Sequence, residues 1–445
     1  MPSVMWFRRD LRLGDNPALL EAAADDVLPL FVLDPALWGP AGPVRRAYLG
    51  ASLRALDESL PPDASLAVVE GDPVRRVVEA AREVDATRVH VAADYGPYGH
   101  QRDLDVEQAL ADAGIRLVRT GSPYAVAPGR VTNGSGSPYK VFTPFSKAWA
   151  DHGWRAPVEA PHGISWLGLA ENTAIPDPGL PDGIELPEAG EAAARRRWRD
   201  FLEDRVGDYA GDRDRPGVDG TSRMSVHLKW GEIHPRTMLA DLARHRSEGA
   251  ATYRKELAWR EFYADVLFAR PETAREYLRP EFAKMEYDDP ADRLDAWREG
   301  RTGFPVVDAG MRQLRATGWM HNRLRMIVAS FLVKDLHLEW QHGARHFMHW
   351  LVDGDLASNQ HGWQWTAGSG TDASPFFRVF NPTSQGRKFD PDGAYVRRWV
   401  PELADADDPH DPSPEARRRA GYPEPIVDHA EERREALDRW ERIRR

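Results

Sequence analysis

The first 120 residues alternate short apolar runs with amphipathic stretches of helical period. Runs such as "SVMWF", "VLPLFVLD" and "TRVHVAAD" have the length and content of buried strands, and the stretches between them, such as "PVRRVVEAARE", space apolar residues three and four apart. Strands that alternate with helices pair in parallel through right-handed crossovers and need cover on both faces. The pattern predicts an N-terminal α/β domain over residues 1–125, built on a doubly wound parallel sheet.

The first predicted strand lacks a phosphate-binding glycine loop. "FRRDLRLGDN", residues 7–16, stands where G-x-G-x-x-G or G-x-x-x-x-G-K-[ST] follows the strand in common nucleotide-binding domains. We therefore expect the shape of a nucleotide-binding domain without its usual means of holding phosphate.

Composition changes twice in the rest of the chain. Residues 126–190 are rich in Pro, Gly and Ser and predict a long interdomain linker, although the aromatic segment "YKVFTPFSKAWADHGW" predicts that it packs rather than hangs free. From residue 191 the period is helical, which predicts a mostly α-helical domain over residues 191–445. The fold class is thus α/β followed by all-α.

The absence of cysteine restricts the chemistry. A chain of 445 residues with no cysteine has no disulfide, zinc-thiolate site, iron–sulfur cluster or thiol nucleophile. We predict no metal site. The charged N-terminus and the lack of about 18 consecutive apolar residues predict a soluble, cytoplasmic protein without a membrane partner.

Charge is unevenly distributed. The net charge of -11 argues against a protein that coats nucleic acid without specificity. Residues 301–350 nevertheless hold seven Lys and Arg against three Asp and Glu, so a local basic face is compatible with the sequence.

Four segments of the helical half carry unusual combinations of side chains. "GTSRMS", residues 220–225, suits a diphosphate before a helix, although a plain helix cap has the same composition. "YRKELAWREFY" places Glu256, Trp259, Arg260 and Tyr263 on one helix face, where the alternative is a solvated Glu–Arg pair beside a core aromatic. The other two segments are "GWMHNRLRMIVASFLVKDL", with Trp319, Asn322, Arg323 and Met326 expected on one face, and "DGDLASNQHGWQW", residues 353–365.

The motifs together resemble one family across nearly the whole chain. "WFRRDLRLGDNPAL", "GTSRMS", "WREFY", "TGFPVVDAGMRQLRATGWMHNRLRMIVASFLVKDL" and "DGDLASNQHGWQWTAGSGTDASPFFRVFNP" occur in the order typical of the DNA photolyase and cryptochrome family. Among its members the chain is most similar to the microbial class I cyclobutane pyrimidine dimer photolyases. The resemblance implies a U-shaped FAD in the helical domain. The residues implied to bind it are Tyr209, Thr221, Ser222, Arg223, Met224, Ser225, Arg260, Trp319, Asn322, Arg325, Asp353, Asp355 and Asn359.

Asn359 matches the family position that faces the flavin N5. An amide both accepts from N5–H and donates, and it adds no negative charge beside a reduced flavin. Plant cryptochromes have Asp there and animal cryptochromes often Cys, so Asn is typical of photolyases. The alternative is a turn Asn that caps the next segment.

The resemblance also implies the reaction. Excited reduced FAD donates an electron to a flipped-out pyrimidine dimer, the ring opens, and the electron returns. Trp259 and Trp365 match the two aromatic walls of the lesion, and Glu256 matches the residue that hydrogen-bonds a pyrimidine and stabilises the dimer radical anion. The residues implied to contact the lesion or the strand are Arg213, Glu256, Trp259, Asn322, Arg323, Met326, Trp365, Arg378 and Gln385.

One helix bears on the kind of lesion. Photolyases that act on the (6-4) photoproduct have two His residues where this chain has Asn322 and Met326, since that repair needs proton transfer. His321 is adjacent but is expected to point elsewhere. The sequence favours cyclobutane dimers.

Trp363 and Trp340 match the first two members of the tryptophan chain that photoreduces oxidised flavin. The alternative for both is core packing. The third, surface tryptophan of the family is missing, and Tyr287 stands in its place, so we expect Tyr287 to end the chain as a neutral radical.

The N-terminal domain of this family often holds a light-harvesting chromophore. The residues implied to bind it are Phe31, Leu33, Asp34, Arg46, Asp94 and Tyr98. They match the type that binds 8-hydroxy-5-deazaflavin, whereas Gly99 replaces the acid typical of methenyltetrahydrofolate binding. Methenyltetrahydrofolate, a flavin or no antenna are the alternatives.

Two other functions are alternatives to the repair of dimer-containing DNA by a monomer. A cryptochrome-like blue-light photoreceptor would share the fold and FAD but commonly carries a long signalling tail, whereas this sequence ends at Arg445. A light-independent electron-transferring flavoprotein would leave Trp259 and Trp365 unexplained.

Overall fold

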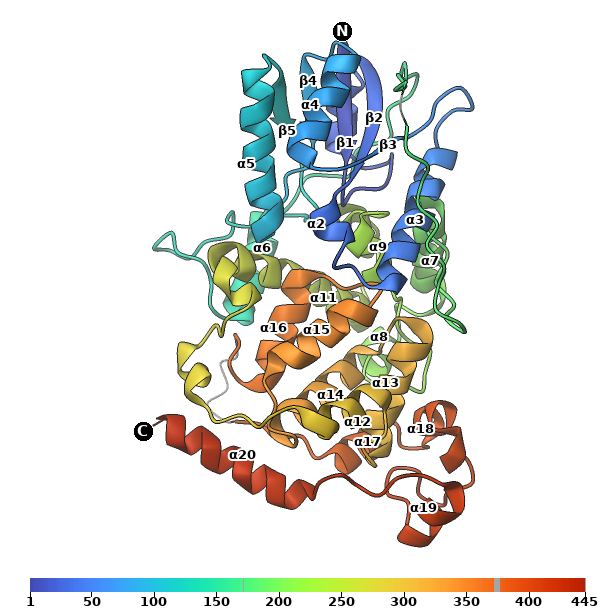
Figure 1. Ribbon diagram of the computed structural model, residues 1–445, viewed down its shortest axis with the longest axis vertical. Helices are drawn as coiled ribbons and strands as arrows, with labels where there is room; N and C mark the ends of the chain where they lie inside the picture. The colour runs from blue at the N-terminus through green and yellow to red at the C-terminus, as the bar shows by residue number, and fades with distance from the viewer. Residues whose placement is uncertain (171, 372–376, 445) are drawn as a thin grey trace. The chain divides into compact units, whose positions relative to one another are not determined.

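The computed structural model describes residues 1–170, 172–371 and 377–444, so the "DASPF" part of the last motif lies outside the described residues. The chain forms two compact units that interleave along the sequence (Figure 1). Unit 1 comprises Met1–Pro181, Pro187–Gly207 and Ser222–Pro271, and unit 2 comprises Asp182–Leu186, Asp208–Thr221 and Glu272–Arg445. The domain limits expected at residues 125 and 190 stay a prediction.

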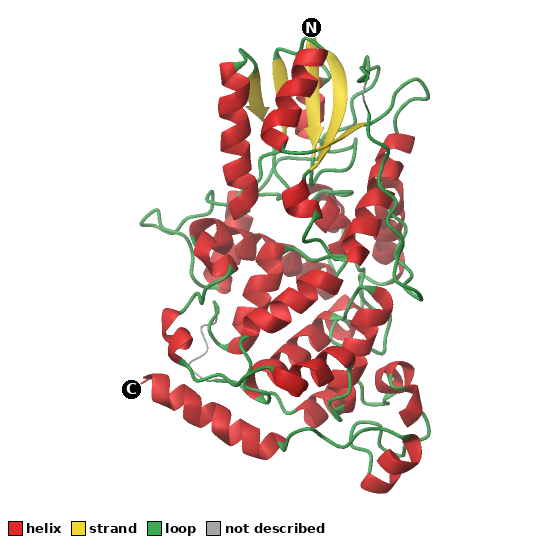
Figure 2. Cartoon of the chain, viewed as in Figure 1, coloured by secondary structure: helices red, strands yellow, loops and turns green. Residues whose placement is uncertain are grey.

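Unit 1 contains a five-stranded sheet in which every pair of neighbouring strands is parallel (Figure 2). Its order is β3-β2-β1-β4-β5. The strands are β1 (Pro2–Phe7), β2 (Asp26–Leu33), β3 (Ala67–Glu70), β4 (Arg88–Val91) and β5 (Arg116–Arg119). The doubly wound parallel sheet expected from the alternating pattern is confirmed.

Alternate residues of β1 enter different hydrophobic clusters. Val4 and Trp6 pack in one cluster with residues of α4 and α5, and Met5 and Phe7 pack in another with residues of α1 and α3. This period of two is what a sheet covered on both faces requires. The helices of unit 1 are α1 (Pro17–Ala22), α2 (Pro35–Trp38), α3 (Pro43–Glu58), α4 (Pro73–Glu83), α5 (Pro97–Asp112), α6 (Phe142–His152), α7 (Glu191–Asp204), α9 (Ser225–Trp230), α10 (Pro235–Leu242) and α11 (Glu248–Ala269).

Side chains occupy the region where the strand order reverses. In open parallel sheets a ligand commonly binds outside the carboxyl ends of the strands at this switch point, which here lies between β1 and β4. Arg8, directly after β1, binds Asp103 and the carbonyl oxygen of Ala92, and the Arg102 guanidinium lies 3.0 Å from Asp103 and 3.4 Å from Asp94. Paired charged side chains therefore follow β1 where a glycine loop is common.

Unit 2 is helical. Its helices are α8 (Tyr209–Asp212), α12 (Ala291–Glu299), α13 (Pro305–Thr317), α14 (Asn322–Lys334), α15 (Trp340–Trp350), α16 (Leu356–Ala367), α17 (Pro382–Phe389), α18 (Ala394–Trp399), α19 (Pro414–Ala420) and α20 (His429–Arg444), with short 3₁₀ turns η1 (Pro271–Ala274), η2 (Pro280–Lys284) and η3 (Pro401–Leu403). Trp297, Phe331, Trp340 and Phe347 are fully or almost fully buried in its core.

Trp319 does not lie on the same helix as Asn322, Arg323 and Met326, so the expectation that the four share one helix face is wrong. Gly318, in the left-handed conformation, ends α13, and the His321 ring accepts from the Arg323 N–H to cap α14. Trp319 therefore belongs to the turn between two helices.

Within the described part of the chain, none of the helices combines the length and apolar composition needed to cross a bilayer.

Candidate functional site

Trp259 of α11 is supported by a second aromatic ring. The Phe142 ring stacks on it with 3.6 Å between ring centroids and 6° between planes, and Tyr263, one turn further on, lies 5.4 Å away. Trp259 is half-buried. Because Phe142 covers one face of the indole and locks its orientation, the ring is a rigid surface for stacking.

Arg260 is held by backbone oxygens of unit 1. Its two terminal nitrogens donate to the carbonyls of Pro123 (3.0 Å) and Leu228 (3.3 Å), and its guanidinium lies 4.7 Å from the centre of the Tyr124 ring. Arg260 thus ties α11 to the end of α9. Any ligand contact of Arg260 uses its remaining N–H groups.

Glu261 was not predicted as a site residue, yet it is one of the best-connected side chains of unit 1. It accepts from the backbone N–H groups of Ala125 and Val126 and from the Trp149 indole (2.6 Å). Burial raises the pKa of Glu261 although these donors oppose the shift. Its place inside "WREFY" was the available signal, but the partners are more than 100 residues away.

The "TSRMS" segment has the geometry of a turn into a helix. Ser222 and the Tyr253 hydroxyl lie 2.7 Å apart, Arg223 has a positive φ of 54°, and α9 begins at Ser225. Burial raises the pKa of Tyr253, the Ser222 hydrogen bond opposes the shift, and Glu256, three residues further along α11, adds to it. Ser222 therefore connects this segment to the α11 face that carries Tyr253 and Glu256.

In unit 2, Arg325 and Asp353 form an ion pair. One terminal nitrogen of Arg325 lies 3.1 and 2.8 Å from the two carboxylate oxygens, and its Nε donates to the carbonyl of Met320. Asp355 caps α16, since its Oδ1 accepts from the Ser358 N–H at 3.0 Å. The two carboxylates of the motif thus have separate partners.

Asn359 leaves one polar atom without a partner. Its Nδ2 donates to the carbonyl of Ala344 in α15 (3.1 Å) and to Gln360 Oε1 (2.8 Å). The side chain is only 9% exposed, and no donor to its Oδ1 lies among the described residues. A carbonyl oxygen that the protein orients and that has no donor suits a ligand N–H.

Two amides of α16 hold a distant loop and were missed by the sequence analysis. Gln360 donates to the Ala274 carbonyl (2.6 Å). Gln364 accepts from the Leu278 N–H (2.7 Å) and donates to the carbonyls of Thr273 and Glu276 (3.0 and 3.1 Å). The only signal was their place in "SNQHGWQW".

Trp363 and Trp340 come from facing helices. A Cβ built on Gly343 of α15 would lie 2.0 Å from the Trp363 ring, so only glycine fits there, and Trp340 is one turn before Gly343. Trp363 also meets Trp297 edge-on at 6.1 Å. Both Trp363 and Trp340 are buried, and they lie in the same core.

Arg323 forms an ion pair with an acidic residue of unit 2. It lies 2.8 Å from Asp214 and 4.2 Å from the centre of the Phe389 ring. Asn322, at the start of α14, is exposed, and Met326 is half-buried. Of the other predicted strand contacts, Arg213 lies 5.9 Å over the Tyr209 ring and Arg378 is exposed. Trp365 and Gln385 are half-buried.

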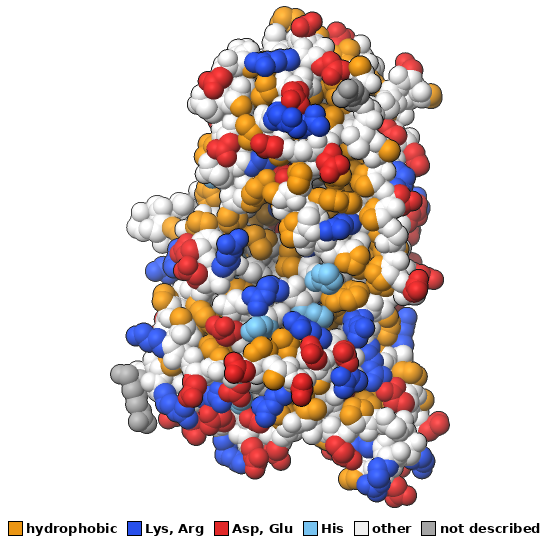
Figure 3. Space-filling view, in the orientation of Figure 1, with side chains coloured by type: hydrophobic (Ala, Val, Ile, Leu, Met, Phe, Trp, Pro, Cys, Tyr) orange, Lys and Arg blue, Asp and Glu red, His pale blue; other side chains and the backbone are white. Residues whose placement is uncertain are grey.

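Four of the seven cations of residues 301–350 pair with acids outside that segment. Examples are Arg301 with Glu299 (2.6 Å), Arg312 with Glu402 (2.7 Å) and Arg325 with Asp353 (2.8 Å). On the molecular face in view, basic and acidic side chains are interspersed (Figure 3). The excess of Lys and Arg in residues 301–350 is therefore largely neutralised by acidic residues that lie outside this segment.

The predicted antenna residues gather at the carboxyl end of β2. Asp34 caps α2 and accepts from the Tyr98 hydroxyl at 2.5 Å, and Arg46 donates to the Trp38 carbonyl at 3.0 Å. Phe31 and Leu33 are buried in β2, and Asp94 follows β4. A Cβ on Gly99 would lie 2.1 Å from an Asp94 carboxylate oxygen, so a side chain at 99 requires Asp94 to move.

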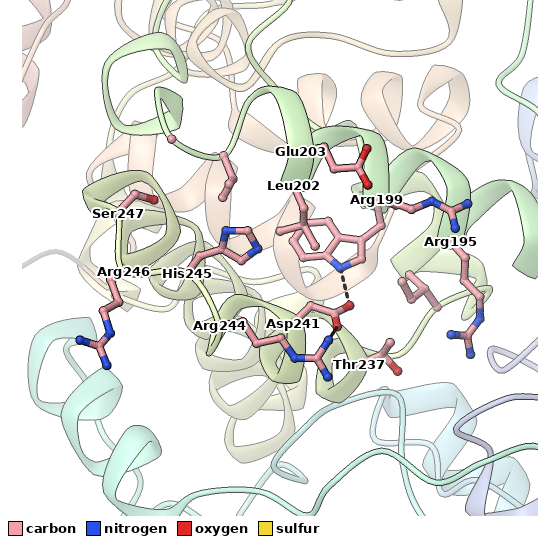
Figure 4. A pocket seen from close by; sticks show the side chains of 14 residues that line it. Arg195, Arg199, Leu202, Glu203, Thr237, Asp241, Arg244, His245, Arg246 and Ser247 are labelled. Atoms are coloured by element: carbon pink, nitrogen blue, oxygen red, sulfur yellow. Dashed lines mark hydrogen bonds and ion pairs between the residues drawn. The ribbon is translucent and has the colours of Figure 1, made fainter.

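A groove of about 840 Å³ in unit 1 contains none of the predicted site residues (Figure 4). Arginines line it beside Trp198, whose indole N–H donates to Asp241 at 3.0 Å. Arg195 already pairs with Glu191 at 2.8 Å, and Arg244 lies 3.7 Å from Asp241. The groove is therefore separate from the residues implied to bind cofactor or DNA.

Comparison with known proteins covers the chain from end to end. Residues 253–442 match the family model for the FAD binding domain of DNA photolyase, and residues 3–162 match the model for DNA photolyase. A Streptomyces griseus protein named deoxyribodipyrimidine photo-lyase is 40% identical over 456 residues, with 99% of each chain covered.

Solved structures agree with this match. A bacterial class III photolyase from Agrobacterium tumefaciens superposes with a TM-score of 0.93 at 37% identity, covering 100% of this chain and 98% of that one. A cryptochrome from Synechocystis sp. PCC6803 gives 0.90 at 28% identity, covering 98% and 99%. The chain belongs to the DNA photolyase family.

Proposed function

We propose that this protein repairs cyclobutane pyrimidine dimers in DNA with light, using bound FAD. The observation that carries the proposal is the full-length match at 40% identity to a relative named deoxyribodipyrimidine photo-lyase, together with the motifs of the sequence. When bound, reduced FAD supplies the excited-state electron for the reaction. The chain's own residues hold the cofactor, position the lesion and exclude water.

The FAD-binding residues are those implied by the resemblance, and Asn359 provides the test of fit. Its Nδ2 is fixed by Ala344 and Gln360, so its Oδ1 is oriented by the protein before any ligand binds. We assign this oxygen to the flavin N5–H. The Arg325–Asp353 pair supplies a neutral, oriented polar group to the same cofactor.

Trp259 and Trp365 each offer an aromatic face to a base of the lesion. The stack of Phe142 on Trp259 supports this role, because the indole is already fixed and loses little freedom on binding. Glu256 is assigned the hydrogen bond to a pyrimidine edge. Arg213, Arg323, Arg378 and Gln385 are assigned to the DNA strand.

Cyclobutane dimers are favoured over (6-4) photoproducts by the start of α14. Neither Asn322 nor Met326 transfers protons at neutral pH, and the His321 ring is engaged as the helix cap. His321 is also buried, at 3% exposed. No histidine of α14 is therefore available as a general acid.

For the antenna we propose 8-hydroxy-5-deazaflavin, bound by Phe31, Leu33, Asp34, Arg46, Asp94 and Tyr98. The close contact between Gly99 and Asp94 supports this choice over methenyltetrahydrofolate, because an acid at position 99 would meet the Asp94 carboxylate, which would then have to move. A flavin or an empty antenna site are the remaining alternatives. The protein is proposed to act as a cytoplasmic monomer.

A photoreceptor role is the second candidate, favoured by the structural similarity to the Synechocystis cryptochrome. One assay separates the two. Chemically reduced protein is illuminated with blue light in the presence of an oligonucleotide that contains one cyclobutane dimer, and intact bases are quantified by chromatography. Repair in the light but not in the dark supports the proposal, and the matched (6-4) oligonucleotide should stay unrepaired. Lack of repair by FAD-loaded, reduced protein contradicts it.

A further inference from the structure

Three aromatic rings of unit 2 form a continuous series. The Tyr277 ring meets Trp340 edge-on with 6.2 Å between centroids and 81° between planes, and it stacks on Tyr287 at 6.3 Å and 15°. Tyr277 is 7% exposed, whereas Tyr287 is more exposed and only packs against the core. Tyr277 thus stands between Trp340 and the residue that matches the family's missing surface tryptophan.

The proton environment of these rings differs sharply. The indole nitrogens of Trp363 and Trp340 are buried and have no hydrogen-bond acceptor in residues 1–170, 172–371 and 377–444. The Tyr277 hydroxyl donates to Glu339 Oε1 at 3.2 Å. An oxidised indole without an acceptor keeps its proton and stays a strong oxidant, whereas a phenol beside a carboxylate can lose its proton as it loses an electron.

A second aromatic branch runs from Trp363 through Trp297 to His346. Trp297 also contacts Trp363, but it is 0% exposed and its indole donates to the carbonyl of Val328 at 3.0 Å. A backbone carbonyl is a hydrogen-bond acceptor but a very weak base. The His346 ring lies 5.4 Å from Trp297, but burial lowers the pKa of His346 to about 3, so His346 is a weak base for positive charge on Trp297.

We propose that Tyr277, with Glu339 as its proton acceptor, is the electron donor to oxidised Trp340 when light reduces the cofactor. The inference rests on the proposed function, because light-excited oxidised flavin is the oxidant that first draws an electron from Trp363. In the step itself one electron passes from Tyr277 to the Trp340 cation radical, the phenol O–H bond breaks, and the proton passes to the Glu339 carboxylate. The products are neutral Trp340, a neutral tyrosyl radical and a neutral carboxylic acid.

Burial, the neighbouring Tyr287 and Glu339 raise the pKa of Tyr277, so its phenol is protonated at neutral pH and needs the base. The pKa of Tyr287 is raised by burial to about 12. Tyr287, stacked outside Tyr277, is then the ring that an external reductant meets.

Gln360 and Gln364 are positioning residues for this donor. Their bonds to Ala274, Thr273, Glu276 and Leu278 fix the backbone on both sides of Tyr277. The same helix carries Trp363 and Asn359. One short helix therefore orders both ends of the electron path within unit 2.

The test uses oxidised holoprotein, a light flash, and transient absorption with electron paramagnetic resonance to identify the radicals. In the parent protein we expect a tyrosyl radical that replaces the Trp340 radical more slowly in heavy water. Tyr277→Phe should remove that radical and lengthen the life of the Trp340 radical. Glu339→Gln should slow tyrosine oxidation by about 100-fold, the lower end of what a positioned general base contributes.

The controls keep the outcomes apart. Glu339 precedes α15 but makes no side-chain capping bond, so Glu339→Gln removes a base and not a helix cap. Tyr287→Phe should preserve the tyrosyl radical and its isotope effect. Tyr395→Phe removes a buried phenol that is bonded to Gln313, and this variant should behave as the parent.

The inference is overturned if Tyr277→Phe forms a tyrosyl radical as fast as the parent. Chemically reduced Tyr277→Phe should repair dimers normally, and if the parent also fails in that assay, the proposed function is at fault instead.

Discussion

The Asn359 side chain donates to the backbone carbonyl of Ala344 across 3.1 Å, which joins α16 to α15 and fixes the amide in one orientation. This bond needs a donor at the Nδ2 position. A carboxylate there would place two oxygens against each other.

Asn359→Asp should make the flavin potential depend on pH. Burial and the Ala344 carbonyl raise the pKa of the new carboxyl, so below that pKa the neutral acid donates to Ala344 as Asn359 does. As pH rises through that pKa, a negative charge forms and the midpoint potential of bound FAD falls. Redox titrations over a pH series measure this. Asn381→Asp, the same change at the exposed cap of α17, is the matched control and should leave the potential unchanged.

Replacing Trp259 or Trp365 by Ala should weaken binding of dimer-containing DNA by about 1 to 3 kcal/mol, the usual value for base stacking on an aromatic ring. FAD content should stay near that of the parent. Fluorescence anisotropy with damaged and undamaged duplexes measures the difference. Equal affinity of the parent protein for both duplexes contradicts the assignment.

Phe142→Leu tests whether the rigid stack matters. Trp259 keeps its contact surface but loses the ring that holds it at 3.6 Å. We expect a smaller loss of affinity than for Trp259→Ala, caused by the freedom of the indole. If Phe142→Leu binds lesions as the parent does, the stack has only a packing role.

Glu261→Gln should lower stability by about 1 to 3 kcal/mol, because an NH₂ group then faces one of three buried donors. The deficit should depend on pH. The raised pKa of Glu261 means that its contribution to stability is fully present below the unfolded-state pKa and is lost as pH rises through the folded-state pKa. The deficit is therefore largest in acid. Urea unfolding at several pH values measures it, with the exposed Glu203→Gln as control.

Asp214→Asn should strengthen DNA binding. It removes the negative charge 2.8 Å from Arg323, so the guanidinium becomes available to a phosphate. The slope of log K against log salt should steepen by about 0.9, the value for one more phosphate contact. Arg323→Ala should weaken binding, and an unchanged salt slope in Asp214→Asn would argue that Arg323 does not contact the strand.

Much of the fold was predictable because its determinants are local. Short apolar runs and helical spacings of three and four depend on neighbouring residues, and the parallel sheet and helix α11 were predicted from them. The turn at Gly318 was harder to predict from the sequence, because apolar residues continue through it. The prediction therefore put Trp319 on a helix. A glycine three residues before the His321 cap was the available signal.

The site was predictable only where a motif was contiguous. Glu261, Tyr277 and Glu339 depend on partners 62 or more residues away, so no local window relates them. The same holds for Asp214, whose partner Arg323 lies in another helix. Such pairings arise from tertiary packing, which a single sequence does not encode locally.

The amide bonds of Gln360 and Gln364 also bear on the order of folding. They join residues 86 to 91 positions apart in the chain. Closing a loop of that length costs entropy before any contact repays it, so the backbone around Tyr277 gains its native hydrogen bonds only after α16 has docked. In pulse-labelling hydrogen exchange, the Leu278 amide should gain protection late. A nascent chain in which residue 364 has not yet left the ribosome already contains every aromatic residue up to Trp363. It still lacks the Gln364 hydrogen bonds that hold the backbone around Tyr277 in place.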